Sequence, residues 1–370
     1  MNKKRKIAFV GNDAVSMMNF RLGVMKALTQ EYEVVMVTPH NCDLSPLEGT
    51  SIRFISIEVD RKGTNPFEDY RLYRTLKALY RTEQFDFIFH FTIKPNIYGS
   101  LAASALRIRH IDVVTGLGYT FIRRNWLFRI SCLLHRFSLR HAQTVWFLNQ
   151  DDCDAFMSLH LVRPDKTLII PGEGVNTDFY HALSPLPDTF TFIYAGRMLR
   201  YKGVELFVQA AKTLQKEYPN VRWQLLGPLD ADDPERITST AMENYVQHGW
   251  VEYLGVFKDV RPYIERSSCS VLASYFREGI PRALLEAAAM ERPIIATNTV
   301  GCKDVVVDGV NGLLCEKKSL DSLVQAMRRM IEMPREQLVA MGKAGRERMI
   351  AHFDERIIID IYKKALNAYA

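Results

Sequence analysis

Short apolar segments alternate with longer amphipathic segments along most of this chain. The expected strands of the first half are KIAFVG, EVVMVTP, RFISIEV, FDFIFHF, IDVVTG, TVWFLN and TLIIPGEGV. A second alternation begins with FTFIYAGR and continues through VRWQLLG, VEYLG, CSVLAS and PIIAT. Strands joined by crossover helices pair in parallel, and a parallel sheet needs helices on both faces. The pattern therefore predicts a doubly wound α/β fold that occurs twice.

The length agrees with two domains, because a single core stops growing beyond roughly 250 to 300 residues and this chain has 370. The alternation breaks at 181–189, HALSPLPDT, where two prolines interrupt any regular period. We expect an amino-terminal Rossmann-like domain over 1–182, a carboxyl-terminal Rossmann-like domain over 183–353 and a final helix over 354–370. Ligands bind beyond the carboxyl ends of parallel strands, so the expected site is a cleft that both domains face.

Composition excludes several classes of protein. The six cysteines are scattered without a C-x-x-C pair, which argues against a zinc site and for reduced thiols in the cytoplasm. The apolar run after MNKKRK is far shorter than that of a signal peptide. No apolar stretch approaches the roughly 20 residues of a membrane-spanning helix. We therefore expect a cytoplasmic protein that is soluble or peripheral to a membrane.

Two glutamates, Glu278 and Glu286, flank the start of an expected helix in REGIPRALLEAAAMERPIIAT. Pro281 suits the first helical position. The unpaired backbone N–H groups at this start would be those of Gly279, Ile280 and Arg282. Such a helix start binds phosphate, whereas carboxylates bind hydroxyls, so we expect a sugar ring at Glu278 and a ribose at Glu286. The alternative is that both are surface acids, with Glu286 paired to Arg282 at helical spacing.

A second loop, in YAGRMLRYKG, follows the first strand of the carboxyl-terminal half. Gly196 opens the turn, and Arg197 and Lys202 flank it. Two cations at the carboxyl end of a strand suit a diphosphate. Taken alone, this could equally be a basic surface loop.

The segments GRMLRYKG, VEYLGVFKDVRPYIERSSCSVLASYFREGIPRALLEAAAMERPIIAT and GVNGLL closely resemble the carboxyl-terminal half of family 4 retaining glycosyltransferases of GT-B fold. The resemblance implies that Glu278 contacts the donor sugar, Glu286 the ribose, and Arg197 and Lys202 the diphosphate. It also implies that the last helix crosses back onto the first domain. The donor would be a nucleoside-diphosphate sugar, most simply UDP-linked.

The amino-terminal half resembles bacterial transferases that extend polyprenyl-diphosphate-linked sugars, including N-acetylgalactosaminyl transferases, through KPNIYGSLAA and VVTGLGYTF. Many relatives have a Gly-Gly turn after the first strand. This chain has GNDAVSMMNFR, so Gly11 is left to allow close backbone approach, with Asn12 beside it as an acceptor contact.

Further acceptor-side candidates lie at strand ends. His90 ends FDFIFH, where a neutral imidazole would bond a sugar hydroxyl or, alternatively, stay structural. Lys94 would meet an acceptor phosphate or remain solvated. Thr115, Gly116 and Gly118 would line the acceptor through their backbone or form only a tight turn.

The stretch 121–141 interleaves apolar and aromatic residues with arginines and contains no acid. A basic amphipathic helix of this kind fits an anionic membrane surface, the alternative being a packed helix with a solvated basic face. We expect peripheral association with the inner face of the plasma membrane and no nucleic-acid partner.

The expected reaction moves a hexose or N-acetylhexosamine from the donor to a lipid-linked sugar with retention of configuration. We expect no metal and no cofactor, because no D-x-D element stands at a suitable strand end. A nicotinamide-dependent oxidoreductase is disfavoured, since neither opening strand is followed by G-x-G-x-x-G. A sugar-nucleotide epimerase or hydrolase of the same fold and a non-catalytic membrane-binding protein remain as alternatives.

Overall fold

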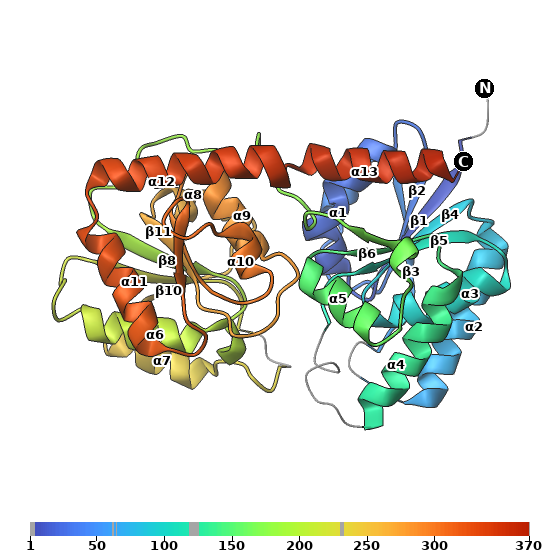
Figure 1. Ribbon diagram of the computed structural model, residues 1–370, viewed down its shortest axis with the longest axis horizontal. Helices are drawn as coiled ribbons and strands as arrows, with labels where there is room; N and C mark the ends of the chain where they lie inside the picture. Colours follow the sequence, from blue (N-terminus) through green and yellow to red (C-terminus); the bar gives the residue numbers. More distant parts are fainter. Residues whose placement is uncertain (1–3, 61–62, 64, 118–125, 230–232, 370) are drawn as a thin grey trace. The chain divides into compact units, whose positions relative to one another are not determined.

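The computed structural model describes residues 4–60, 63, 65–117, 126–229 and 233–369. The chain forms two compact units, each with one parallel sheet covered by helices (Figure 1). Unit 1 contains residues up to Glu173 together with Glu355–Ala370, and unit 2 contains Gly174–Asp354. The predicted repetition of a doubly wound α/β fold is therefore confirmed.

Unit 1 is built on a 7-stranded sheet of order β3-β2-β1-β4-β5-β6-β7. Its strands are β1 (Lys6–Val10), β2 (Glu33–Thr38), β3 (Ile52–Ser56), β4 (Phe87–Phe91), β5 (Arg109–Val114), β6 (Val145–Phe147) and β7 (Thr167–Ile169). Its helices are α1 (Ala14–Leu28), α2 (Pro66–Glu83), α3 (Ser100–Ala105), α4 (Trp126–Ser138), α5 (Gln150–Ser158) and α13 (Glu355–Ala368). Short helical turns are η1 (Ser45–Leu47), the π-helix η2 (Pro95–Gly99), η4 (Leu139–His141) and η5 (Pro164–Lys166).

The last helix of the chain is part of the core of unit 1. Tyr362 of α13 is fully buried and lies 5.6 Å from the ring of Phe9, 4.8 Å from Phe89 and 4.9 Å from Trp146. These residues come from β1, β4 and β6, so α13 covers the centre of one face of the sheet. The chain thus returns to unit 1 after completing unit 2.

Unit 2 has a 6-stranded sheet of order β10-β9-β8-β11-β12-β13. Its strands are β8 (Thr191–Ala195), β9 (Arg222–Leu226), β10 (Glu252–Gly255), β11 (Cys269–Leu272), β12 (Ile294–Thr297) and β13 (Gly312–Cys315). Its helices are α6 (Val204–Leu214), α7 (Ser239–Gln247), α8 (Arg261–Glu265), α9 (Arg282–Ala289), α10 (Cys302–Val305), α11 (Leu320–Glu332) and α12 (Arg335–Arg348), with the turns η6 (Arg200–Lys202) and η7 (Met349–Phe353). The pattern of the sequence does not predict α12.

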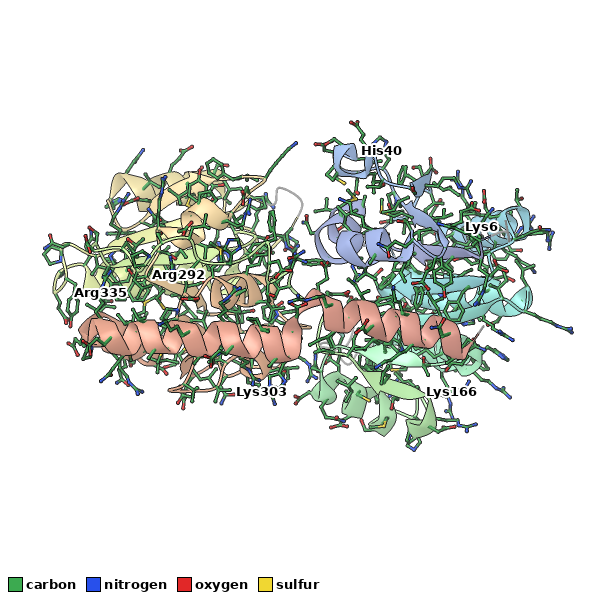
Figure 2. All side chains as sticks on the ribbon, turned by 90° about the horizontal axis from the view of Figure 1, so that it is seen from above. Lys6, His40, Lys166, Arg292, Lys303 and Arg335 are labelled. Atoms are coloured by element: carbon green, nitrogen blue, oxygen red, sulfur yellow. The ribbon has the colours of Figure 1, made fainter. Side chains whose placement is uncertain are left out.

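The boundary between the units lies before the proline-rich stretch rather than within it. The backbone N–H of Val175 donates to the carbonyl of Phe353 at 2.8 Å, and Val175 pairs with Asp354 in an isolated parallel bridge. Arg292, which Figure 2 labels, is nearly fully buried and donates to the carbonyls of Ser184 and Glu265 at 3.1 and 2.8 Å. Residues after Gly174 therefore make their hydrogen bonds within unit 2, ahead of the expected boundary at 182.

Candidate active site

The order of the strands in unit 2 marks one place where the chain reverses its direction across the sheet. From β8 the chain adds β9 and β10 on one side, and it then crosses to β11 on the other side. Such a switch point opens a crevice at the carboxyl ends of the two central strands. The loop after β8 carries Arg197 and Lys202, and the loop after β11 carries Glu278 and Gly279. The topology thus brings together the two loops that the sequence singles out.

Lys202 and Glu278 form an ion pair in this crevice. The Lys202 Nζ lies 2.6 Å from each carboxylate oxygen of Glu278, and the two side chains are only 19% and 11% exposed. The hydroxyl of Ser274 donates to Glu278 Oε1 at 2.7 Å. Charges that are partly removed from water act more strongly on a bound group than surface charges do. The pair is therefore a preorganised polar centre rather than two solvated side chains.

Glycines let the backbone of neighbouring loops approach closely around this pair. Gly203, which follows Lys202, has φ of +84°, and a Cβ there would lie 2.2 Å from the carbonyl oxygen of Ala273. A Cβ at Gly301 would lie 2.3 Å from the carbonyl oxygen of Gly279, and one at Gly227 would lie 2.0 Å from that of Gly196. The loops after β8, β9, β11 and β12 therefore meet backbone to backbone.

Arg197 is the most exposed of the predicted donor residues. Its backbone carbonyl accepts a hydrogen bond from the Tyr194 hydroxyl at 2.8 Å. Tyr194 is fully buried, and burial raises the pKa of its phenol. The hydrogen bond from the buried, neutral Tyr194 phenol thus holds the backbone of the turn that carries the Arg197 guanidinium.

Glu286 lies in α9 and pairs with Arg282, whose Nε is 2.8 Å from Glu286 Oε1. The i,i+4 ion pair that the surface-acid alternative predicts is therefore present. The Glu286 side chain is nevertheless largely buried rather than at the surface. The Arg282 guanidinium carbon lies 6.0 Å from the centre of the Tyr180 ring. Burial raises the pKa of the Tyr180 phenol, and the nearby Glu286 carboxylate raises it further. Sequence reasoning missed Tyr180 because only the folded chain brings it to α9.

The start of α9 differs slightly from the expectation. Helix α9 begins at Arg282, and Pro281 is the N-cap residue with extended backbone, rather than the first helical residue. Gly279 and Ile280 precede the helix in the loop, and Ile280 packs against the core of unit 2. The helix start still lies in the same loop as Glu278.

Two apolar residues that the sequence-based reasoning also missed follow β10. Val256 and Phe257 are exposed, and the Phe257 ring lies 4.3 Å from that of Tyr263. Because all strands of the sheet are parallel, these residues lie at the same edge as the Lys202–Glu278 pair. Their exposure beside a polar crevice suits a flat ring system.

Unit 1 has its own switch point, between β1 and β4. Gly11, buried after β1, donates its N–H to the carbonyl of Val37 at 3.0 Å, and Asn12 beside it is partly exposed. Thr92, after β4, has φ of +71°, which is rare for a β-branched residue and typical of functional sites. Within unit 1, this edge is the counterpart of the edge of unit 2 that carries the Lys202–Glu278 pair.

Lys94 lies at that edge, but its ammonium group is not solvated, because it already forms an ion pair within the protein. Its Nζ is 2.7 Å from Asp69 Oδ1, and both side chains are largely buried. The Tyr98 hydroxyl donates to the other oxygen of Asp69 at 2.8 Å. The expected acceptor phosphate would have to compete with this carboxylate for the ammonium group.

Thr115 and Gly116 follow β5 and are partly exposed at the same edge, as expected of residues that line a site through their backbone. Gly116 has φ of +142°, a conformation that favours glycine. Gly118 lies outside the described residues.

His90 is not at a binding surface, so the structural alternative holds and the expected contact with a sugar hydroxyl does not. The residue is fully buried within β4, and its Nδ1 lies 2.8 Å from Asp112 Oδ1 and its Nε2 3.1 Å from the Tyr80 hydroxyl. Burial lowers the pKa of His90 to about 3. Both ring nitrogens are occupied, so the imidazole has no free atom for a sugar hydroxyl. Its role is structural.

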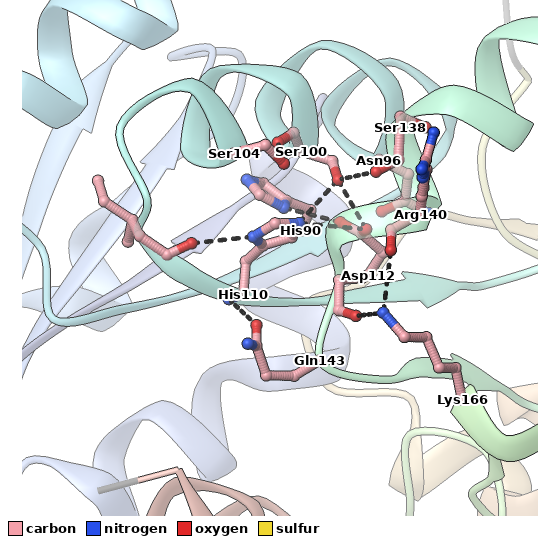
Figure 3. Close-up of polar contacts among 12 residues, drawn as sticks. His90, Asn96, Ser100, Ser104, His110, Asp112, Ser138, Arg140, Gln143 and Lys166 are labelled. Carbon is pink, nitrogen blue, oxygen red and sulfur yellow. Dashed lines mark hydrogen bonds and ion pairs between the residues drawn. The ribbon is translucent and has the colours of Figure 1, made fainter.

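The partner of His90 belongs to a larger buried network, which Figure 3 shows around Asp112. The Ser100 hydroxyl lies 2.9 Å from Asp112 Oδ2, 2.8 Å from His110 Nε2 and 2.9 Å from the carbonyl oxygen of Ser138. Burial raises the pKa of Asp112 to about 7. The network connects β4 and β5 to α3 and to the end of α4.

The His90–Asp112 pair gives a testable pH dependence. Between about pH 4 and 6.5 this pair binds one proton in the folded protein, on Asp112, and one proton in the unfolded protein, on His90. Because the number of bound protons is equal, the contribution of the pair to the free energy of unfolding does not change with pH in this range. Asp112→Asn removes the folded proton, and the free energy of unfolding should then rise about 1.4 kcal/mol per pH unit more steeply. Urea denaturation across this range measures the slope.

The control for this experiment is Asp360→Asn, an exposed carboxylate of α13 in the same unit. It should follow the wild-type curve. Parallel curves for Asp112→Asn and wild type would contradict the protonation assignment.

Within the described residues, no group of three or more His, Cys, Asp or Glu side chains is arranged to hold a metal ion.

Family models match both halves of the chain. Residues 6–149 match the model described as glycosyl transferase 4-like, and residues 189–333 match the model described as glycosyl transferases group 1. The second match contains Lys202, Glu278 and Glu286. Tyr180 lies outside both matches.

Two curated relatives align over most of the chain. The N,N'-diacetylbacillosaminyl-diphospho-undecaprenol alpha-1,3-N-acetylgalactosaminyltransferase of Campylobacter jejuni is 26% identical over 97% of each chain. The UDP-Gal:alpha-D-GlcNAc-diphosphoundecaprenol alpha-1,3-galactosyltransferase of Escherichia coli is 22% identical over 86% of this chain and 87% of the relative. Among solved structures, Anabaena Alr3699/HepE in complex with UDP and glucose has a TM-score of 0.82 at 17% identity, covering 98% of this chain and 99% of that chain. The structural match confirms the expected GT-B fold.

Proposed function

The chain belongs to the glycosyltransferases, with a glycosyl transferase 4-like amino-terminal half and a group 1 carboxyl-terminal half, and we propose that it transfers a hexose or N-acetylhexosamine from a UDP-sugar to a sugar carried on a polyprenyl diphosphate. The names of the aligned relatives, both of which act on diphospho-undecaprenol-linked sugars, support this acceptor class. The proposed setting is cell-surface polysaccharide or glycan assembly, by a cytoplasmic protein at the inner face of the plasma membrane.

The observation that carries the proposal is the Lys202–Glu278 pair at the switch point of unit 2. A bound UDP-sugar brings a diphosphate for the ammonium group and sugar hydroxyls that donate to the carboxylate. Each member of the pair would exchange its partner for one on the donor, so neither charge is left buried alone. Arg197 supplies a second cation for the diphosphate, and Glu286 accepts from the ribose.

In the proposed reaction the bond between the anomeric carbon and the diphosphate oxygen breaks while the acceptor oxygen attacks from the same face. The proton of the acceptor hydroxyl passes to the departing phosphate oxygen, which gives retention of configuration. Lys202 and Arg197 stabilise the negative charge that grows on the diphosphate, an electrostatic effect often worth several kcal/mol. We propose that these side chains and the start of α9 do this without a metal.

The exposed pair after β10 extends the proposal to the nucleobase. Val256 and Phe257 offer an apolar surface at the edge where the diphosphate is proposed to bind. A pyrimidine ring packed there would orient the ribose toward Glu286. Asn12, Thr115 and Gly116 remain the proposed acceptor contacts in unit 1, and Gly118 lies beyond the described residues. Gly11 is proposed to let a bound substrate approach the backbone closely.

Calorimetry with UDP, GDP and ADP, followed by the matching nucleotide sugars, tests the donor assignment. We expect selective binding of UDP and a roughly tenfold or greater loss of affinity in Glu286→Ala, because ribose hydroxyls lose a charged acceptor. Glu336→Ala, an exposed glutamate of α12, should bind like wild type.

Absence of nucleotide binding by folded wild-type protein would reject the donor site. Product analysis then separates the same-fold alternatives: release of free sugar or inversion at C2 without any acceptor would indicate a hydrolase or an epimerase.

A further inference from the structure

Helix α4 exposes one continuous apolar face. Its large apolar side chains that lie open to solvent are Trp126 (66% exposed), Ile130 (46%), Leu133 (54%) and Phe137 (56%). Their spacing of four, three and four residues puts them on one side of the helix. Most exposed apolar residues on protein surfaces occur singly, so a row of four on one helix requires an explanation.

The opposite face of α4 is fixed in the core of unit 1. Ser131, His135 and Ser138 are buried, and the carbonyl oxygen of Ser138 accepts from the Ser100 hydroxyl at 2.9 Å. After the helix, Lys166 donates to the carbonyls of Arg140 and Ala142 at 2.9 and 2.7 Å (Figure 3). Rotating α4 to bury its apolar face would break these contacts. The exposed row is therefore a stable feature of the folded unit.

Arginines flank the apolar row. Arg129, Arg136 and Arg140 are all exposed, and the stretch from Trp126 to His141 contains no acidic residue. An apolar row of aromatic and aliphatic side chains bordered by arginines alone is complementary to an anionic lipid interface. A partner protein would be expected to require some neutral or acidic contacts as well.

A second exposed apolar group lies on the first turn of α2. Phe67 is 83% exposed and Tyr70 is 59% exposed, whereas Leu72 and Leu76 of the same helix are buried. Both α2 and α4 pack against the π-helix η2, and both begin at the lower end of unit 1 in Figure 1. Asp69 in this turn is neutralised by Lys94, which leaves Glu68 as its remaining acid.

The two helix starts lie on the acceptor side of unit 1. Helices α2 and α4 follow strands β3 and β5 in the chain, so their first residues lie toward the carboxyl edge of the parallel sheet. That is the edge that carries Asn12, Lys94 and Thr115. A lipid surface in contact with Phe67 and Trp126 would thus hold a lipid-linked acceptor near the residues proposed to bind it.

We infer that α4 and the first turn of α2 form a docking face for the surface of an anionic bilayer. The apolar side chains that enter the interface are Trp126, Ile130, Leu133, Phe137, Phe67 and Tyr70. The side chains that contact lipid phosphates are Arg129, Arg136 and Arg140. The inference rests on the proposed function only for the identity of the acceptor, since the docking face itself is argued from exposure and charge. No helix among the described residues is long and apolar enough to cross a bilayer.

Flotation with phosphatidylglycerol-containing and pure phosphatidylcholine vesicles tests the docking face. We expect the wild type to bind anionic vesicles and to be released by high salt. Trp126→Ala with Phe137→Ala should weaken binding roughly tenfold or more, because aromatic rings anchor at membrane interfaces. Arg129→Gln with Arg136→Gln should weaken it up to about 30-fold at low salt, at about 1 kcal/mol per basic residue.

Matched controls remove the same groups elsewhere in unit 1. Leu168→Ala with Ile169→Ala changes exposed apolar residues of β7, and Lys26→Gln with Arg81→Gln removes two exposed charges. Both should bind vesicles like wild type. Binding of the α4 variants equal to that of these controls would overturn the inference, as would a dimer in solution that dissociates in Trp126→Ala with Phe137→Ala.

Nucleotide binding by the same variants separates the two proposals. The α4 variants should bind UDP as wild type does, because the donor site lies in unit 2. UDP binding without vesicle binding by wild type would reject the docking face alone. Vesicle binding without nucleotide binding would reject the proposed transferase while leaving the docking face in place.

Discussion

Lys202→Ala is expected to lower the turnover number of sugar transfer by roughly 10²–10³-fold, the scale of losing one preorganised charge that stabilises the transition state. The donor should still bind, more weakly, through Arg197 and Glu286. The measurement is transfer at saturating donor, using the sugar nucleotide identified by calorimetry. Lys343→Ala, an exposed lysine of α12, is the matched control and should keep wild-type turnover.

The ion pair predicts more than a loss of rate. Without Lys202 the Glu278 carboxylate stays largely buried and keeps the hydrogen bond from Ser274 but loses its ion-pair partner, which should cost about 3 kcal/mol of stability. Lys202→Ala combined with Glu278→Ala should therefore be more stable than Lys202→Ala alone, although equally inactive. Turnover within threefold of wild type in Lys202→Ala would remove the pair from the mechanism.

Gly203→Ala is expected to destabilise unit 2 by about 2–5 kcal/mol and to abolish UDP binding. The residue has φ of +84°, and the added methyl would lie 2.2 Å from the carbonyl oxygen of Ala273. The left-handed backbone costs alanine about 1–2 kcal/mol, and the overlap with backbone adds about 1–3 kcal/mol. Because Ala273 precedes Ser274, a shift there would displace the donor of the hydrogen bond to Glu278.

The control for Gly203 separates backbone strain from steric overlap. Gly309 also has positive φ, +75°, but a Cβ there meets nothing within 4 Å. Gly309→Ala should therefore cost only about 1–2 kcal/mol and leave UDP binding intact. Calorimetry and thermal unfolding of the two variants give the comparison. Equal behaviour of both would show that the close approach of the two loops has no role in the site.

The juxtaposition of the two loops proposed to bind the donor could be predicted because their position follows from chain order. Each loop stands between a strand and a helix, Lys202 in the first loop and Glu278 in the second. The two loops must lie together if their strands are parallel neighbours in the sheet. The alternation of strands and helices in the sequence predicts that the strands are parallel, and the sheet has β8 next to β11. Side chains at the ends of adjacent parallel strands then have to lie near each other.

His90 shows where this reasoning stops. Its position near the end of an apolar strand fits a ligand-binding residue and a buried residue equally well. The difference depends on Asp112, which the register of β4 with β5 puts directly opposite His90. No local sequence pattern encodes the register between strands that a helix separates. Asp112 could therefore not be identified from the sequence as the hydrogen-bond partner of the His90 imidazole.

Helix α12 and Tyr180 were missed for related reasons. Gly342 lowers the helical propensity of its segment, yet the absence of a side chain lets α12 approach the carbonyl of Glu291, 2.2 Å from where a Cβ would be. Tyr180 lies in a stretch without regular period, and its contact with Glu286 depends on the path of the chain around unit 2. Both features are tertiary in origin.

The burial of Tyr362 against Phe9, Phe89 and Trp146 has a consequence for the synthesis of the protein. Domains generally fold as they emerge from the ribosome, at about 5–20 residues per second, but the first unit lacks its last helix until nearly the whole chain has been translated. Until then, the aromatic face of its sheet stays uncovered. The nascent first unit would therefore depend on chaperones for longer than the second, and a premature stop a few residues upstream of α13 would harm the unit made first.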